Sequence, residues 1–382
     1  MIKYRKAAAL AVVLILLATT AAASELLPVP TEAAARVDDF YADAAILYNK
    51  STDEAVFERN ADARLPIAST TKIMTALVAI ENSPLDSIVT VSREAVGVEG
   101  SSIYLEAGEK MVLRDMLYAL MLESANDSAV AIAVHVAGSV EAFVGLMNDK
   151  ARLIGMNNTH FENPHGLSSD NHYSSARDMA KLFSYALDNP DFAAITASKN
   201  YKSPLKDEGY RYFSNHNRLL SLLDGCIGGK TGYTKNAGRC LVSGSVRDNI
   251  CMICVTLDAG DDWNIHKALT DYGFSLYEKR RIAAKRQFVF NVPVVGGESD
   301  YASVSNAEAL EVCVKKGSPP ITHTVELFLF YYPPTAQGDE AGRIVFKQAG
   351  KYVGEVKLYF DNNVNIKPKK SFWQRIFGKG IK

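Results

Sequence analysis

The spacing of the apolar residues changes at Tyr277, and this change most restricts the folds that the chain can adopt. Before Tyr277, runs with helical spacing, such as Leu113 to Met121, alternate with strand-like runs. After it, apolar residues alternate along short segments such as Tyr352 to Phe360, and helical spacing is nearly absent. The 382 residues also exceed the usual size of one domain. We therefore expect a mixed helix-and-strand domain over residues 24–277 and a small all-β domain over 278–366.

Several strands can be placed from local patterns. Ala44 to Asn49 and Ala55 to Phe57 have strand composition and are joined by a turn, which predicts an antiparallel pair. Arg239 to Ser245 and Asn249 to Leu257 predict two adjacent buried strands, and Trp263 to Tyr277 predicts the last helix of the first domain. Strands are also expected in the second domain, with a hairpin turn at Lys347–Lys351, over residues 287–292, 324–332, 342–346 and 352–360.

The N-terminus has the pattern of a secretory signal peptide. Met1 to Lys6 is basic, Ala7 to Ala18 is apolar, and Ala21 to Ala23 fits a cleavage site, so we expect residues 1–23 to be removed on export. An uncleaved anchor is the alternative, but the apolar run is short for a spanning helix. The formal net charge of -1 argues against nucleic acid as a partner. A basic stretch, Lys279 to Arg286, predicts a connector between the two domains.

The C-terminal residues 367–382 are basic and amphipathic. On a helix, Phe372, Trp373, Ile376 and Phe377 fall on one face, with basic residues around them. This pattern predicts a helix that lies in the plane of a membrane interface and is too short to span it. A disordered basic tail is the alternative.

The cysteines and histidines predict neither a metal site nor another cofactor. Cys251 and Cys254 have the spacing of half a zinc or redox site, but they lie in an apolar run typical of a buried strand, where residues three apart point to opposite faces. Three histidines match no usual ligand spacing: His160, His165 and His172. We expect core packing for the cysteines and loop hydrogen bonds for the histidines.

Ser69 and Lys72 lie three residues apart where an apolar helical run begins. If Ser69 begins this helix, Lys72 lies on the same face, and the positive end of the helix dipole favours developing negative charge. A hydroxyl and an amine in such positions can form an activated nucleophile. A serine that caps the helix beside a solvated lysine is the alternative, and for this segment alone it is the commoner arrangement.

Two further polar motifs follow along the chain. Ser124 and Asn126 lie between two mostly apolar helical runs, where polar residues either cap helices or face a cavity. Lys230, Thr231 and Gly232 precede two buried strands and therefore lie at an edge of the sheet, where the glycine lets another backbone approach closely.

In this order, these three motifs form the signature of penicillin-binding proteins and class A β-lactamases. Longer segments resemble the low-molecular-mass penicillin-binding proteins that are serine-type D-alanyl-D-alanine carboxypeptidases: 65–75, 163–167, 173–180 and 229–234. The resemblance covers about residues 36–277, and the β domain and tail resemble the same family in architecture. It implies an α+β fold of the β-lactamase/transpeptidase-like type: an antiparallel sheet flanked by helices, with an α-helical subdomain.

The resemblance also implies a role for each residue of the first two motifs. Ser69 would attack the carbonyl between two D-alanines of a peptidoglycan stem peptide and form an acyl-serine. Lys72 would be the base, provided that burial and the charge of Lys230 lower its pKa. Ser124 would relay a proton to the leaving amine. Asn126 would hold Lys72 and the substrate amide.

The third motif would bind the substrate. By resemblance, Lys230 and Thr231, with Thr234, would receive the terminal carboxylate. Gly232 separates them from Tyr233, whose backbone N–H would form the oxyanion hole with that of Ser69. β-Lactams would acylate the same serine. One departure concerns the carboxylate: family members often place a basic residue soon after the following strand, whereas Leu257 to Trp263 is acidic here.

Three alternatives remain open from the sequence. A serine β-lactamase would need a second base, typically a Glu-x-x-Asn loop, and Glu162-Asn163 lacks that spacing. A D,D-endopeptidase would cut crosslinks instead of removing terminal D-alanine. A non-catalytic cell-wall binding protein would not need all three motifs intact. Signal and tail together predict an exported protein on the outer face of the bacterial cytoplasmic membrane.

Overall fold

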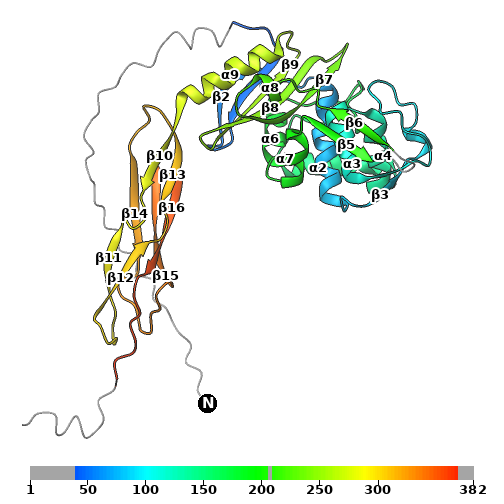
Figure 1. The fold of residues 1–382 in the computed structure, drawn as a ribbon. Helices are drawn as coiled ribbons and strands as arrows, with labels where there is room; N and C mark the ends of the chain where they lie inside the picture. The colour runs from blue at the N-terminus through cyan, green and yellow to red at the C-terminus, as the bar shows by residue number, and fades with distance from the viewer. Residues whose placement is uncertain (1–38, 205–208, 369–382) are drawn as a thin grey trace, which may run out of the picture. The chain divides into compact units, whose positions relative to one another are not determined.

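The computed structural model describes residues 39–204 and 209–368 (Figure 1). These residues form two compact units with the boundary between Tyr277 and Glu278. We call them the N-terminal unit and the C-terminal unit. The predicted signal peptide lies outside the described residues, as does the predicted tail helix from residue 369 onward.

The N-terminal unit is built on an antiparallel five-stranded sheet in the order β2-β1-β9-β8-β7. Its central strands are almost fully buried because α9 covers one face, while α6 and α7 lie on the other (Figure 1). The elements are β1 (Ala44–Asn49), β2 (Glu54–Arg59), β7 (Cys226–Thr234), β8 (Gly238–Arg247), β9 (Ile250–Leu257), α6 (Ala176–Ala186), α7 (Pro190–Ala197) and α9 (Asp262–Leu276). The expected pairing of the two strands before Ser69 and of the two strands after Lys230 is confirmed.

A helical subdomain packs beside strand β7. Its apolar residues belong to the largest hydrophobic cluster of the molecule, which also includes the inner face of the sheet. Its elements are the 3-10 helix η1 (Ala68–Thr71), α2 (Lys72–Asn82), α3 (Leu113–Tyr118), a π-helical turn (Ala119–Glu123), α4 (Asn126–Ala137) and α5 (Val140–Leu153). The short helix α8 (Leu219–Leu222) belongs to a separate small cluster, in which Leu219 packs with Leu241 of β8 and Trp263 of α9. Short strand pairs complete the unit: β3 (Ile88–Thr90) with β4 (Lys110–Val112), and β5 (Asn200–Pro204) with β6 (Tyr210–Ser214).

Local sequence explains where several helices begin and end. Ser139 and Ser175 cap α5 and α6, since each hydroxyl accepts a backbone N–H from the first turn. Asn189 caps α7, whose first residue is a proline. Gly138 ends α4 in the left-handed conformation. No single helix among the described residues is long and apolar enough to cross a membrane; α4 and α5 together have the length and composition but meet at 86°.

The C-terminal unit contains only strands among its described residues. A five-stranded antiparallel sheet has the order β11-β12-β16-β15-β14, and β10 pairs with β13. The strands are β10 (Tyr277–Ala283), β11 (Val289–Pro293), β12 (Tyr301–Asn306), β13 (Leu310–Lys315), β14 (Ile321–Leu327), β15 (Glu340–Gln348) and β16 (Lys351–Phe360). The predicted hairpin between β15 and β16 is confirmed, with Ala349 and Gly350 at the positive φ angles that a tight turn needs.

The expected basic connector at Lys279 to Arg286 was wrong, because residues up to Ala283 form strand β10. Two of its basic side chains, Lys279 and Arg281, are neutralised from the neighbouring strand β13. Lys279 Nζ lies 2.6 Å from a carboxylate oxygen of Glu311, and Arg281 lies 3.1 Å from the other. A strand with charged residues on its outer face therefore had the composition of a linker.

The expected strand over 324–332 was also too long, since β14 ends at Leu327. The backbone then turns toward the end of β11, where Tyr331 N–H donates to Pro293 O at 2.8 Å. The aromatic residues after Leu327 therefore form a loop.

Candidate active site

Ser69 lies in a tight turn that leads directly into α2. The preceding residue, Ala68, has a φ of +46°, a conformation that is strained for a residue with a Cβ. Two hydroxyls fix this turn: Thr70 Oγ donates to Ile67 O at 2.6 Å, and Thr71 Oγ donates to Ala68 O at 2.8 Å. The turn leaves Ser69 half-buried at the start of the helix, where the sequence predicted it.

Lys72 is fully buried, with 0% of its surface exposed. Its Nζ lies 2.9 Å from Ser69 Oγ, 2.6 Å from Asn126 Oδ1 and 2.7 Å from His165 O. Burial lowers the pKa of Lys72 well below its ordinary value of 10.5, the positive charge of Lys230 lowers it further, and Asp127 opposes this in part. A buried amine with a depressed pKa beside a hydroxyl is suited to accept its proton.

Ser124 and Asn126, at the start of α4, lie close to Ser69 and Lys72. Asn126 is held on both sides: its backbone N–H donates to Ser101 O at 2.7 Å, and its side-chain Nδ2 donates to Glu99 O. The amide oxygen therefore points to Lys72. Ser124 follows the π-helical turn with a left-handed backbone (φ 61°) and is nearly buried. This conformation directs it toward the pocket that contains Ser69.

Strand β7 forms the opposite wall and is the predicted sheet edge. A Cβ on Gly232 would lie only 3.0 Å from Ser69 N, so glycine permits the strand to pass directly beside the serine. Lys230 is 1% exposed; burial lowers its pKa to about 7, and its Nζ donates to Thr231 O at 3.1 Å. Thr231 and Tyr233 face the pocket.

Thr234 ends strand β7 beyond the residues that face the pocket. Its hydroxyl accepts the N–H of Ala237 at 3.0 Å and lies 3.4 Å from Ser168 Oγ, so it stabilises the turn between β7 and β8. It is not among the residues that line the pocket. The other predicted residues are together, either on the pocket wall or buried directly behind it.

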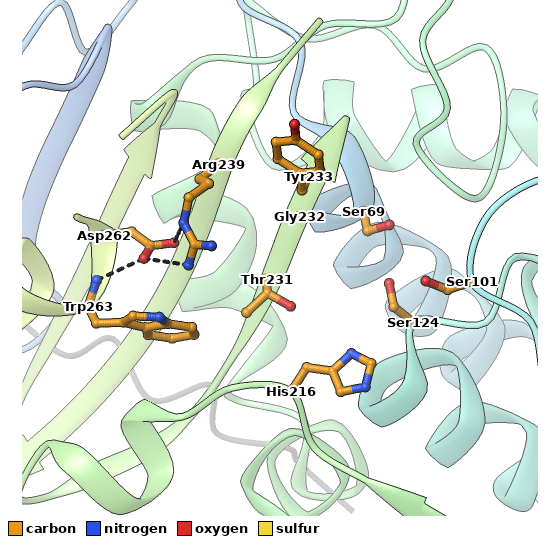
Figure 2. Close-up of a pocket in the computed structure, with 10 residues that line it drawn as sticks. All are labelled: Ser69, Ser101, Ser124, His216, Thr231, Gly232, Tyr233, Arg239, Asp262 and Trp263. Carbon is orange, nitrogen blue, oxygen red and sulfur yellow. Dashed lines mark hydrogen bonds and ion pairs between the residues drawn. The ribbon is translucent and has the colours of Figure 1, made fainter. Parts of the chain in front are cut away.

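The pocket has a volume of about 360 Å³ (Figure 2). Figure 2 shows Ser69, Ser101 and Ser124 on one side and Thr231 and Tyr233, from strand β7, across from them. Five of its lining residues were not predicted: Ser101, His216, Arg239, Asp262 and Trp263. The position of Arg239 follows from the hairpin register, in which it pairs with Tyr233, and this signal is available once the turn between the strands is known.

The expected loop hydrogen bonds of the histidines are confirmed. His172 Nδ1 accepts the N–H of Glu162 at 3.1 Å, so its Nε2 is left to donate to Thr71 Oγ at 2.8 Å. Burial lowers the pKa of His172 to about 4 and that of His165 to about 3, so both are neutral near pH 7. Over 39–204 and 209–368, no three His, Cys, Asp or Glu side chains are grouped to hold a metal ion.

Comparisons with known proteins agree with the geometry. A family model described as D-alanyl-D-alanine carboxypeptidase matches residues 31–261, and one described as penicillin-binding protein 5, C-terminal domain, matches 277–365. The chain is 33% identical to D-alanyl-D-alanine carboxypeptidase DacF of Bacillus subtilis over 82% of its own length and 83% of that protein. It is 32% identical to D-alanyl-D-alanine carboxypeptidase DacC of Escherichia coli, over 85% of its own length and 84% of that protein.

A solved structure is similar over nearly the whole chain. The crystal structure of D-alanyl-D-alanine carboxypeptidase DacD from Francisella tularensis superposes with a TM-score of 0.63 at 26% sequence identity. The match covers 91% of this chain and 98% of that one, so it includes both units. The expected α+β fold with a following all-β domain is confirmed.

Proposed function

This chain belongs to the D-alanyl-D-alanine carboxypeptidase family, and we propose that Ser69 is the nucleophile of its serine peptidase reaction. The substrate of the family is a peptidoglycan stem peptide that ends in D-Ala-D-Ala. One observation supports this role above all: Ser69 Oγ lies 2.9 Å from the buried Nζ of Lys72, whose pKa is lowered. No other arrangement in the pocket pairs a hydroxyl with a base of this kind among the described residues.

The contacts of Lys72 define its role in acylation. As a neutral amine it donates its two N–H groups to Asn126 Oδ1 and His165 O, which leaves the lone pair for the hydroxyl proton of Ser69. Ser69 Oγ then attacks the scissile carbonyl as Lys72 takes the proton. The backbone N–H groups of Ser69 and Tyr233 stabilise the oxyanion, a contribution of roughly 3 kcal/mol for one such donor.

Breakdown of the tetrahedral intermediate needs a proton on the leaving nitrogen. Ser124, on the same wall as Ser69, relays this proton from Lys72 to the amine of the departing D-alanine. The C–N bond breaks, D-alanine leaves, and an acyl ester remains on Ser69. Water then attacks the ester as Lys72 takes its proton, the ester C–O bond breaks, and Lys72 returns the proton to Ser69 Oγ as the shortened peptide leaves. Lys230 and Thr231, from strand β7 on the opposite side of the pocket, bind the substrate.

β-Lactam antibiotics present a carbonyl to the same serine, and we expect their adducts to be stable. Among the described residues that line the pocket, Asp262 is the one carboxylate, and it is paired with Arg239. Glu162 instead accepts the hydroxyl of Ser169 and the N–H of Asn171 on an exposed loop. Over residues 39–204 and 209–368, the pocket therefore offers no second carboxylate base for the rapid deacylation that a β-lactamase needs.

Release of D-alanine from diacyl-L-Lys-D-Ala-D-Ala tests the function, and labelled penicillin tests the nucleophile. Wild type should release D-alanine and be labelled, and Ser69→Ala should do neither. Ser221→Ala, at an exposed serine of α8, should match wild type in both assays. Labelling that survives Ser69→Ala would refute the nucleophile. Cleavage of dimeric muropeptides without release of terminal D-alanine would indicate an endopeptidase, and absence of both would indicate a binding protein.

We also propose that the protein is exported and held peripherally on the outer face of the cytoplasmic membrane. The basic, apolar and small-residue pattern of residues 1–23 supports export. The amphipathic pattern of residues 367–382 supports the anchor. Removal of residues 367–382 should release the mature protein into the soluble fraction, and a truncated protein that stays on the membrane contradicts this anchor.

A further inference from the structure

Arg239 lies in the pocket although it belongs to none of the three motifs. In the β7–β8 hairpin it pairs directly with Tyr233, so its side chain is on the same face of the sheet as those of Tyr233 and Thr231. All three line the pocket that contains Ser69 (Figure 2). A long cationic side chain is therefore present one strand away from the expected oxyanion hole.

A buried carboxylate fixes the orientation of this arginine. Arg239 Nε and Nη2 donate to the two carboxylate oxygens of Asp262 at 3.2 and 2.8 Å. Asp262 is buried, begins α9, and also accepts the N–H of Trp263 at 2.9 Å. The guanidinium carbon lies 5.7 Å from the centre of the Trp263 ring. Asp262 and Trp263 thus hold Arg239 in one direction, and 43% of its side chain remains exposed.

The pairing leaves one edge of the guanidinium available. An arginine has five N–H donors, and Asp262 takes two of them through Nε and Nη2. The Nη1–Nη2 edge keeps the other three, without a partner among the described residues. This edge matches the two oxygens of a carboxylate. Lys230, by contrast, is buried with a pKa lowered to about 7, so it is only partly charged at neutral pH.

We propose that Arg239 is the specificity-determining residue that receives the terminal carboxylate of the substrate. The inference rests on the proposed carboxypeptidase function. It also accounts for the departure found in the sequence: the acidic segment Leu257 to Trp263 supplies Asp262, which positions an arginine from the neighbouring strand. The carboxylate is then bound by a cation that cannot lose its charge near neutral pH.

Two substrates that differ only in this charge test the proposal: diacyl-L-Lys-D-Ala-D-Ala and its C-terminal amide. Wild type should prefer the acid, and Arg239→Gln should lose roughly 10²-fold in kcat/KM on the acid but stay within about threefold on the amide. Arg239→Lys, which keeps the charge but not the fork, should be intermediate. Lys235→Gln, on the exposed turn of the same hairpin, should leave both values unchanged.

The ratio of kcat/KM on the acid to kcat/KM on the amide separates the two roles, because a purely structural role of Arg239 would not change it. Asp262→Asn should lower this ratio less than Arg239→Gln, because the arginine remains but is less well oriented. Equal losses on both substrates, or an unchanged ratio in Arg239→Gln, would overturn the proposal while wild-type release of D-alanine upholds the function. No release by wild type from the acid would overturn the function and this proposal together.

A second, independent observation concerns the C-terminal unit. The loop at residues 328–332, which we call the aromatic loop, exposes four apolar side chains to between 44% and 69%: Phe328, Leu329, Phe330 and Tyr332. The loop itself is fixed. Tyr331 points inward, where its hydroxyl donates to Ala341 O at 2.6 Å and its ring packs against Phe360 at 5.1 Å. The exposure therefore belongs to an ordered surface.

The aromatic loop lies beside the segment from which the predicted tail continues. Tyr331 O accepts the N–H of Val295 at 2.9 Å, and the next residue, Gly296, accepts the N–H of Lys367 at 3.0 Å. Val295 and Ile366 are also exposed and extend the apolar surface. An apolar surface is thus adjacent to the start of a basic, amphipathic segment.

We infer that the aromatic loop inserts into the headgroup region of a lipid bilayer as a second membrane contact. Aromatic rings are favoured at this depth, and the neighbouring tail brings the same end of the unit to the bilayer. This inference rests on the proposed membrane location. A protein partner or a second copy of the chain would bury the same rings without lipid.

Sedimentation of the full chain with vesicles of phosphatidylcholine and phosphatidylglycerol tests the second inference. Combined Phe328→Ser and Phe330→Ser should lower the partition coefficient about tenfold. Combined Tyr210→Ser and Tyr212→Ser, at exposed aromatic residues of β6, should not change it. A chain without residues 367–382 should bind these vesicles far more weakly than the full chain, too weakly to stay in the membrane fraction of cells, and the loop substitutions should remove the binding that remains.

Three results would contradict the aromatic-loop inference. Unchanged binding of the Phe328 and Phe330 variant would leave the tail as the sole contact. Loss of self-association without loss of vesicle binding would assign the loop to a second copy. Absence of any wild-type binding would overturn the membrane location as well.

Discussion

The two units treat charged side chains in opposite ways. The N-terminal unit buries lysines and aspartates around the pocket and within its core: Lys72, Asp115, Asp127, Asp178, Lys230 and Asp262. In the C-terminal unit, no charged side chain is buried among the described residues, and the buried polar ones are neutral: Ser305, Asn306 and Thr335. Its charges instead form exposed pairs, such as Arg343 with Glu326 at 2.7 Å.

This difference indicates that the N-terminal unit performs the reaction and that the C-terminal unit has a supporting role. A buried charge costs several kcal/mol unless partners satisfy it, so a fold retains one only where structure or function requires it. Asp127 shows how the cost is offset: its carboxylate accepts the Ser102 hydroxyl and the N–H groups of Ile103 and Leu105. Lys72 and Lys230 have no such carboxylate contact, and their pKa values fall instead. In the part of the C-terminal unit that the structure describes, no comparable group is buried.

Lys72→Met should have the largest effect, because it removes the base of the N-terminal unit. We expect release of D-alanine and acylation by labelled penicillin to fall by roughly 10³- to 10⁴-fold. The thermal midpoint should not fall, since a methionine relieves the burial of an amine. Lys235→Met, at an exposed lysine, is the control. Activity within tenfold of wild type would remove Lys72 from the mechanism.

Asn126→Asp should have the next largest effect. It places a negative charge at the atom 2.6 Å from Lys72 Nζ without changing the shape of the side chain. The added charge raises the pKa of Lys72, so the acidic limb of kcat/KM should move to higher pH and activity at pH 7 should fall roughly 10²-fold. A uniform loss at every pH would show that Asn126 acts only on the substrate.

The pH dependence of unfolding in Lys230→Met measures the cost of burying this lysine independently of its effect on activity. The folded pKa of Lys230 is about 7 against an ordinary 10.5, so the unfolded chain binds the extra proton between these values. The burial penalty is complete below pH 7 and disappears toward pH 10.5. In urea unfolding between these two pH values, the free energy of unfolding of wild type should rise relative to that of the variant by up to about 1 kcal/mol per pH unit. A constant difference would contradict the lowered pKa.

Arg343→Ala, in the C-terminal unit, should have the smallest effect. Its side chain pairs with Glu326 and Glu355 at 2.7 and 3.3 Å on the surface, where solvent screens such pairs and they contribute little to stability. Release of D-alanine should be unchanged, and high salt should remove most of any stability difference. Loss of activity in this variant would show that the comparison between the units is mistaken.

The sequence predicted the parts of the site that depend on local spacing. Ser69 and Lys72 lie within one turn, and Lys230 and Gly232 lie on one strand, so their relations follow from helix and strand geometry alone. The lowered pKa of Lys72 was also predicted, and the structure supplies the burial that causes it.

The remaining features depend on contacts that local spacing does not determine. Arg239 enters the pocket because the β7–β8 turn sets it opposite Tyr233, and Asp262 reaches it from another element. Strand β10 was missed because Glu311, far along the chain, neutralises its basic face. Thr234 was placed in the site by resemblance; its hydroxyl accepts the N–H of Ala237 in the turn after β7, and its contact with substrate stays a prediction.

The protonation state of Lys72 tests the central claim most directly. Titration of ¹⁵N-labelled lysine side chains by NMR, with Lys72→Met to assign the signal, gives this pKa in the resting protein. We predict that the pKa of the Lys72 amine lies well below the ordinary 10.5, so that the amine is neutral at a pH where an ordinary lysine is still protonated. A Lys72 that stays protonated up to about pH 10 would contradict its role as the base.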